Sequence, residues 1–159
     1  MPLGSCQPAV HSVASNEMSS SPITISAARQ GELRSAARDA AQQAYAPYSR
    51  FRVGAALLLE SGEIVSAANV ENTAYGLSIC AERSAVVRAV AQHGPQIRIV
   101  AVTVTTLDDQ PCSPCGACRQ VLAEFMPPDG FVLFAFDGAP QVLTLADLLP
   151  FGFSLAHAK

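Results

Sequence analysis

Small and apolar residues recur with helical spacing in the segment that follows residue 24. They return every three or four positions, and the pattern stops before Pro47. The residues that share this spacing are Leu33, Ala36, Ala37, Ala40, Ala41 and Ala44. One face of a helix has this period, and proline cannot continue a helix. The pattern therefore predicts a first helix between residue 25 and Pro47.

Two apolar runs come next along the chain. Residues 52–59 form a continuous apolar run that is typical of a buried strand, and residues 64–70 form a second one. The four residues between them, Glu60-Ser61-Gly62-Glu63, have the composition of a turn. The two runs therefore predict a β-hairpin.

Helical and strand patterns then alternate. Residues 80–92 are rich in alanine and valine and predict a helix, and the β-branched run 97–105 predicts a strand. Residues 114–125 predict another helix, with Ser113 as its N-cap and Pro114 at its first helical position.

Two short strands and a short helix are expected at the end of the chain. Strands 131–136 and 141–143 flank an Asp137-Gly138 turn. Thr144, with Asp147 three residues later, resembles a capping box for a last helix that ends near Leu149.

This order of elements predicts an α/β fold. Strand, helix, strand, helix and strand follow one another in the middle of the chain, which favours a mixed sheet with helices packed on its faces. Residues 1–24 are rich in serine and proline and lack apolar periodicity, so we expect a disordered or loosely ordered tail there. Residues 25–159 are expected to form one domain.

Composition narrows the possible functions. Of the 159 residues, 50% are hydrophobic and 14% are charged, and so few charges suggest that part of the surface is covered in an oligomer. The net charge is −3 and no basic run occurs, so a nucleic-acid partner is not expected. The only lysine is Lys159, which excludes Schiff-base chemistry and a Walker-type phosphate loop.

Histidine and hydropathy exclude further classes. The three histidines lie in the N-terminal tail, at a predicted helix end and near the C-terminus. No histidines are therefore well placed for a catalytic triad or a two-histidine metal site. No 18-residue apolar run exists, so no membrane span is predicted. The first residues do not resemble a secretory signal, and we therefore expect a cytoplasmic protein.

Cysteines supply the candidate chemistry. The five cysteines are Cys6, Cys80, Cys112, Cys115 and Cys118. Cys80 lies at the start of one predicted helix, and Cys115 and Cys118 lie at the start of another. Since each helix follows a β segment, both helix starts can meet at one edge of the sheet. Three thiolates there could hold Zn²⁺ and leave a fourth position open for water, as in catalytic zinc sites.

Two charged residues beside Cys80 fit the same site. Glu82 could take a proton from water at the metal and hand it to a leaving group. Three thiolates on Zn²⁺ leave a net negative charge, which Arg83 and the two helix N-termini would offset. The plainer alternatives are that Glu82 only favours the helix dipole and that Arg83 is an ordinary surface arginine.

At these residues the sequence resembles a known family. Cys80-Ala81-Glu82 and Pro114-Cys115-Gly116-Ala117-Cys118-Arg119-Gln120 resemble the zinc-dependent cytidine deaminases. Residues 45–49, 51–57 and 69–76 are similar to the small homotetrameric branch that acts on free nucleosides, and the resemblance runs from about residue 27 to 155. It implies a three-layer α/β/α fold with a mixed five-stranded sheet. It also implies one Zn²⁺ per chain, held by Cys80, Cys115 and Cys118.

The resemblance also implies a reaction and a set of substrate contacts. The reaction is hydrolytic deamination of cytidine and 2′-deoxycytidine to the uridines with release of ammonia, in pyrimidine salvage, with Glu82 as the proton shuttle. Phe51 would line the base pocket, Asn69 and Glu71 would hold the ribose hydroxyls, and the backbone near Ala81 would read the pyrimidine edge.

The same resemblance implies that the sites are shared between subunits of a homotetramer. Phe153 would close over the base in a neighbouring subunit, and the segment of Tyr75 would also reach across. Leu148-Leu149-Pro150-Phe151-Gly152-Phe153 places two aromatics just past a short helix, which is typical of an interface.

Several alternatives stay open. Pro111-Cys112-Ser113-Pro114-Cys115 also satisfies Pro-Cys-x-x-Cys, so spacing alone does not decide which cysteines bind the metal. The expected helix start at Pro114 favours Cys115 and Cys118. The other functions to weigh are a four-cysteine structural zinc module, a thiol redox protein, and a deaminase of a cytosine-containing antibiotic.

Overall fold

The elements follow the predicted order. The computed structural model describes residues 25–154, so the tail predicted for residues 1–24 lies outside it. The helices and strands are α1 (Ala27–Ala41), β1 (Val53–Leu59), β2 (Ile64–Ala68), the 3₁₀ turn η1 (Tyr75–Leu77), α2 (Ala81–His93), β3 (Ile99–Thr106), α3 (Gly116–Phe125), β4 (Phe131–Phe136), β5 (Ala139–Thr144) and α4 (Leu145–Leu148). The 3₁₀ turn η1 was not predicted. The capping box of Thr144 and Asp147 is confirmed. Within this part of the chain no helix has the length and apolar character needed to cross a membrane.

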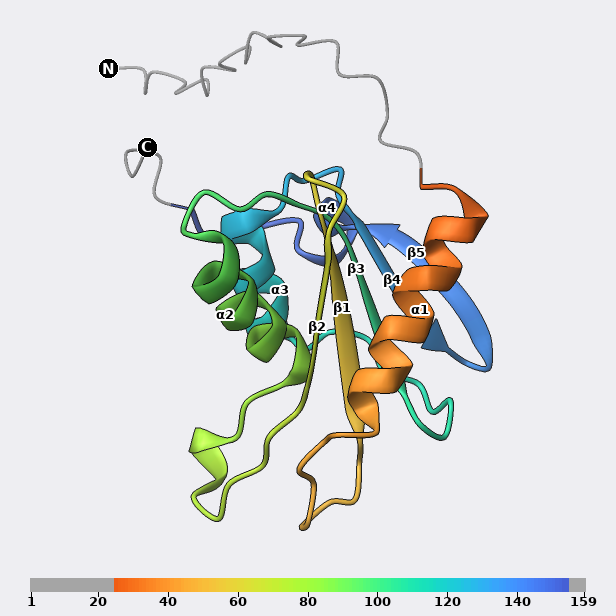
Figure 1. The fold of residues 1–159 in the computed structure, drawn as a ribbon, viewed down its shortest axis with the longest axis vertical. Coiled ribbons are helices and arrows are strands. Elements are labelled where there is room, and N and C mark those ends of the chain that lie inside the picture. Colours follow the sequence, from red (N-terminus) through yellow and green to blue (C-terminus); the bar gives the residue numbers. More distant parts are fainter. Residues whose placement is uncertain (1–24, 155–159) are drawn as a thin grey trace, which may run out of the picture.

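One mixed sheet organises the fold. Its strand order is β2-β1-β3-β4-β5, with β3 and β4 parallel and the other neighbours antiparallel. Helix α1 covers one face of the sheet, and α2 and α3 lie side by side on the other (Figure 1). Two separate apolar clusters fill the spaces between the layers. The predicted three-layer α/β/α architecture with five strands is confirmed.

Helix α1 packs unusually close to strand β1 at Gly54. A Cβ atom built on Gly54 would lie 1.9 Å from the carbonyl oxygen of Ala37 and 2.7 Å from the backbone nitrogen of Ala41. Both alanines are completely buried. The small alanine side chains of α1 therefore allow the helix backbone to approach the strand backbone closely. On the strand side, only glycine leaves room for this approach.

We predict that Gly54→Ala destabilises the protein by about 1–3 kcal/mol or more, because the added methyl group forces the helix and strand apart. Gly31→Ala is the matched control, since nothing lies within 4 Å of its Cβ position on α1 and removing a helical glycine stabilises by roughly 0.5–1 kcal/mol. Urea unfolding of both variants measures the difference. A Gly54→Ala protein as stable as the wild type would contradict the close packing.

The two cysteine-bearing helix starts lie at one end of the molecule. Strand β2 leads into α2 through residues 69–80, and β3 leads into α3 through residues 107–115, and both loops lie at the same end of the sheet (Figure 1). This is the edge at which the sequence predicted that the cysteines would meet.

The predicted start of α3 is wrong by two residues. The helix begins at Gly116 and its N-cap is Cys115, which is extended with φ −68° and ψ 164°, so neither Ser113 nor Pro114 has the predicted position. The proline ring fixes φ near −65°, a value that extended and helical backbone share, so Pro114 could not locate the boundary. Cys115 and Cys118 still share the first turn.

Candidate active site

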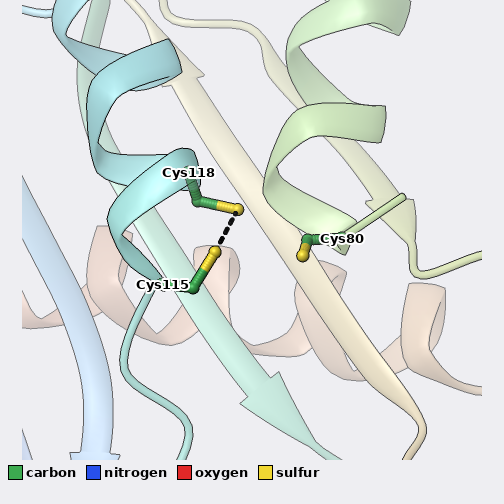
Figure 2. Close-up of side chains that lie close together, drawn as sticks. All are labelled: Cys80, Cys115 and Cys118. Atoms are coloured by element: carbon green, nitrogen blue, oxygen red, sulfur yellow. Dashed lines mark hydrogen bonds between the residues drawn. The ribbon is translucent and has the colours of Figure 1, made fainter. Parts of the chain in front are cut away.

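Three cysteine sulfur atoms converge between the starts of α2 and α3. The Sγ atoms of Cys80, Cys115 and Cys118 all lie within 4.8 Å of one another, and Figure 2 shows them facing a common centre. The Cys115 and Cys118 sulfurs are 3.6 Å apart. Two thiolates bound tetrahedrally to Zn²⁺ at about 2.3 Å would be separated by about 3.8 Å. The spacing and the donor set therefore fit a zinc ion.

Helix geometry favours negative charge on the Cys80 and Cys115 sulfurs, and a guanidinium adds to this effect at Cys80. Cys80 and Cys115 are the N-cap residues of α2 and α3, where the helix dipole stabilises thiolates. A hydrogen bond from Cys118, with Arg83 adding to it, lowers the pKa of the Cys80 thiol to about 5. The Arg83 Nη2 atom lies 3.8 Å from the Cys80 sulfur and donates to the Ser78 carbonyl at 3.2 Å. The structure thus places Arg83 where it can offset the charge of three thiolates.

Cys112 does not join the sulfur cluster, which within residues 25–154 consists of the other three cysteines. Its backbone N–H donates to the Ala135 carbonyl of β4, and burial raises the pKa of its thiol to about 12. The geometry therefore disagrees with the four-cysteine module and with the metal register that includes Cys112.

Glu82 is a buried carboxylate beside the sulfurs. It occupies the first turn of α2, only 4% of its surface is exposed, and it lines a cavity of about 780 Å³ together with Cys80 and Cys115. Burial raises the pKa of Glu82, and the negative charge of Cys80 adds to this effect. A carboxylate that binds a proton more readily than usual is suited to general acid–base chemistry.

The cavity brings together most of the predicted substrate contacts. Phe51, Asn69, Glu71, Tyr75 and Ala81 all line it. Ala81 is fully buried as the first residue of α2, and the first N–H groups of a helix have no partner inside the helix, so its backbone can serve a ligand. Tyr75, in η1, also lines the cavity and is 91% exposed.

The Asn69 side chain binds the backbone at the start of strand β1. Its Oδ1 accepts from the Val53 N–H at 2.9 Å, and its Nδ2 donates to the Phe51 carbonyl at 2.9 Å. An amide oxygen has a second lone pair and an amide nitrogen a second hydrogen. Asn69 is therefore fixed by the backbone and still has one donor and one acceptor for a ligand.

Glu71 is fixed by a loop to which the sequence assigned no role. Its carboxylate accepts from the Tyr48 N–H at 2.9 Å and the Ser49 N–H at 3.3 Å, and also from the Ser49 hydroxyl. The hydroxyl bond and then the Tyr48 bond lower the pKa of Glu71, so it is anionic at neutral pH. Tyr48 and Ser49 lie in residues 45–49, one of the segments similar to the cytidine deaminases. That similarity was the available signal for their importance.

Phe153 is the one predicted substrate contact that lies outside the cavity of its own chain. Within the described residues the cavity lining does not include it, and 71% of its surface is exposed. Its backbone is bound to Gln120 of α3 by two hydrogen bonds. The structure therefore does not bring Phe153 together with Glu82 within one subunit.

Comparisons with known proteins agree with this geometry. The family model described as "Cytidine and deoxycytidylate deaminase zinc-binding region" matches residues 28–134. A cytidine deaminase from Halalkalibacterium halodurans is 45% identical over 116 residues, which cover 72% of this chain and 86% of that protein. The crystal structure of a cytidine deaminase from Burkholderia pseudomallei superposes with a TM-score of 0.70 at 42% identity, covering 77% of this chain and 98% of that one.

An antibiotic deaminase is a more distant relative. The blasticidin-S deaminase of Bacillus cereus is 32% identical over 112 residues, which cover 67% of this chain and 79% of that protein. From the clustered cysteines, the buried Glu82 and these matches, we conclude that the chain belongs to the cytidine and deoxycytidylate deaminase family.

Proposed function

We propose that this chain catalyses the hydrolytic deamination of cytidine and 2′-deoxycytidine, in which water is consumed and ammonia is released. The observation that carries the proposal is the position of Glu82, which is buried beside the three-sulfur cluster in a cavity that also contains Asn69 and Glu71. Pyrimidine salvage in the cytoplasm is the proposed setting.

The three cysteines would hold the zinc ion, which when bound supplies Lewis-acid chemistry and lowers the pKa of water to about 7. Glu82 takes the proton of the attacking water as it adds to C4 of the base. It delivers that proton to ring N3, then takes the second proton from the new C4 hydroxyl and delivers it to the amino group, so that the C4–N bond breaks, ammonia leaves and C4 becomes a carbonyl. Its burial excludes competing water from the carboxylate, and its raised pKa matches a group that must both accept and return a proton.

The polar residues of the cavity select a neutral sugar. Asn69 offers one donor and one acceptor, and Glu71 is a fixed anion, so together they suit ribose hydroxyls. An anionic Glu71 repels a phosphate, and the chain has only one lysine, at its last position. These features support a free nucleoside as the substrate rather than a nucleotide.

We expect Glu71→Gln to raise KM for cytidine while kcat changes little, because a ground-state contact to the sugar is weakened. Hydrogen bonds to charged groups contribute about 1.5–3 kcal/mol, which corresponds to a KM increase of roughly 10- to 150-fold. Glu60→Gln, in the exposed β1–β2 turn, is the control. Steady-state kinetics measure both variants. A fall in kcat of the same size, with KM unchanged, would contradict a sugar-binding role.

Each site is proposed to be shared within a homotetramer. Phe153 and the neighbouring Phe151 are 71% and 97% exposed, and large exposed aromatics of this kind mark interfaces. A Phe153 ring from another chain would stack on the base and exclude water. The exposed Tyr75 at the cavity offers a surface for such a contact.

A substrate panel tests the proposed function. Loss of the cytosine absorbance is followed with purified protein on cytidine, 2′-deoxycytidine, cytidine 5′-monophosphate and blasticidin S. We expect turnover of the two nucleosides and little turnover of the other two compounds. Preferred turnover of the nucleotide or of the antibiotic would overturn the assigned substrate class.

A further inference from the structure

The side chain of Gln120 binds the backbone of Phe153 through both of its polar atoms. Gln120 Nε2 donates to the Phe153 carbonyl at 2.7 Å, and Gln120 Oε1 accepts from the Phe153 N–H at 3.1 Å. The two residues are 33 positions apart in the sequence. An amide side chain is one of the few groups that can satisfy a backbone donor and a backbone acceptor at the same time.

The residue before Gln120 holds the other end of the same segment. Arg119 Nη1 donates to the Leu148 carbonyl at 3.0 Å, and Arg119 Nε donates to the Pro114 carbonyl at 2.7 Å. Two consecutive residues of α3 therefore bind both ends of residues 148–153. The segment is also compact, because a Cβ atom at Gly152 would lie 2.7 Å from the Leu149 Cδ2 atom.

These contacts fix the backbone of the segment without burying its aromatic rings. Phe151 and Phe153 stay 97% and 71% exposed. Hydrogen bonds at an exposed site add little to folding stability, since water competes for the same groups. Fixing both backbone groups of Phe153 instead restricts its φ and ψ angles and thereby the direction of the Cα–Cβ bond that carries the ring. The arrangement is better explained by presentation of the ring than by stability of the fold.

We propose that Gln120 is a positioning residue that fixes the Phe153 ring for the site of a neighbouring subunit. The inference rests on the shared site proposed above. Gln120 then acts together with Phe153 on the active site of the neighbouring subunit. It does not act on the sulfur cluster of its own chain, although it lies only two residues from Cys118. Asparagine is too short to span the same contacts, and glutamate lacks the donor for the Phe153 carbonyl.

Kinetics of single variants give the first test. Stacking of a base on an aromatic ring is worth about 5- to 150-fold in affinity, and we expect Gln120→Ala and Gln120→Glu to raise KM by about tenfold or more within that range. The melting temperature, the zinc content and the tetrameric state should be unchanged. Gln92→Ala, on the exposed end of α2, is the matched control. A KM within about twofold of the wild type in both variants would overturn the inference.

Mixed oligomers decide in which subunit Gln120 acts. Gln120→Ala chains are reassembled with Glu82→Gln chains and assayed well below KM. If each site draws its two contributors independently from equal pools, about a quarter of the sites combine an intact Glu82 with an intact Gln120–Phe153 pair, and kcat/KM should recover to about that level. Gln120→Ala mixed with Phe153→Ala should show no recovery, because both chains present a defective ring.

The opposite pattern would overturn the inference. If Gln120 acted on the metal cluster of its own chain, Gln120→Ala would complement Phe153→Ala and fail to complement Glu82→Gln. The mixture of Glu82→Gln with Phe153→Ala tests the shared site by itself. Failure of this mixture to recover activity would reject the shared site. If this mixture recovers activity but the mixture of Gln120→Ala with Glu82→Gln does not, only the role of Gln120 is rejected.

Discussion

Glu82→Gln is expected to lose most of the deaminase activity while the protein keeps its fold and its zinc. The amide has nearly the shape of the carboxylate but cannot accept and return a proton. General acid–base catalysis contributes about 10²–10⁴-fold to a single proton transfer, and we propose that Glu82 serves more than one transfer. The residue lies only 4% exposed beside the sulfur cluster, where no bulk water can replace it. Steady-state turnover of cytidine measures the loss.

The control for this variant is Glu124→Gln, which changes an exposed glutamate on α3 and should behave as the wild type. Zinc content and melting temperature are measured for both proteins. If Glu82→Gln retained more than about a tenth of the wild-type kcat, the expected loss for a proton shuttle would be absent and the assignment would be wrong.

Cys115→Ala and Cys118→Ala are each expected to release zinc, whereas Cys112→Ser should retain it. The sulfurs of Cys115 and Cys118 lie 3.6 Å apart and within 4.8 Å of the Cys80 sulfur, so removing either one leaves two protein ligands. The Cys112 thiol lies outside that cluster. Metal analysis of the purified variants after dialysis gives the zinc content per chain.

The three cysteine variants serve as controls for one another, because all remove one sulfur from the same end of the molecule. Loss of zinc from Cys112→Ser with retention in Cys118→Ala would move the site to the other register. Activity should follow the zinc content in every variant.

Periodicity was enough to predict a mixed sheet with helices on its faces. The resulting order of elements was enough to predict that the two cysteine-bearing helix starts meet at one edge of the sheet. The alanine pattern of α1 and the apolar runs of β1 and β3 reflect burial, which the sequence displays directly. The start of α3 was missed because proline has the same φ in extended and helical backbone. The turn η1 was missed because three residues are too few to show a period.

The remaining contacts depend on residues that are distant in the sequence. The amide of Asn69 reaches Phe51 and Val53 across a strand pair, and Gln120 reaches Phe153 over 33 positions. No local pattern announces such pairs, because each partner alone has an ordinary surrounding sequence. The exposed ring of Phe153 shows the same limit for assembly, since the surface proposed to cover it lies on another chain.

Reconstitution with zinc tests the central claim most directly. The protein is stripped with a chelator, checked for its fold by circular dichroism, and titrated with Zn²⁺ while cytidine turnover is followed. The three-sulfur cluster beside Glu82 predicts that activity is lost on chelation and rises linearly until one Zn²⁺ is bound per chain. Undiminished deamination by the folded, zinc-free protein would contradict the assignment of this cluster as the catalytic metal centre.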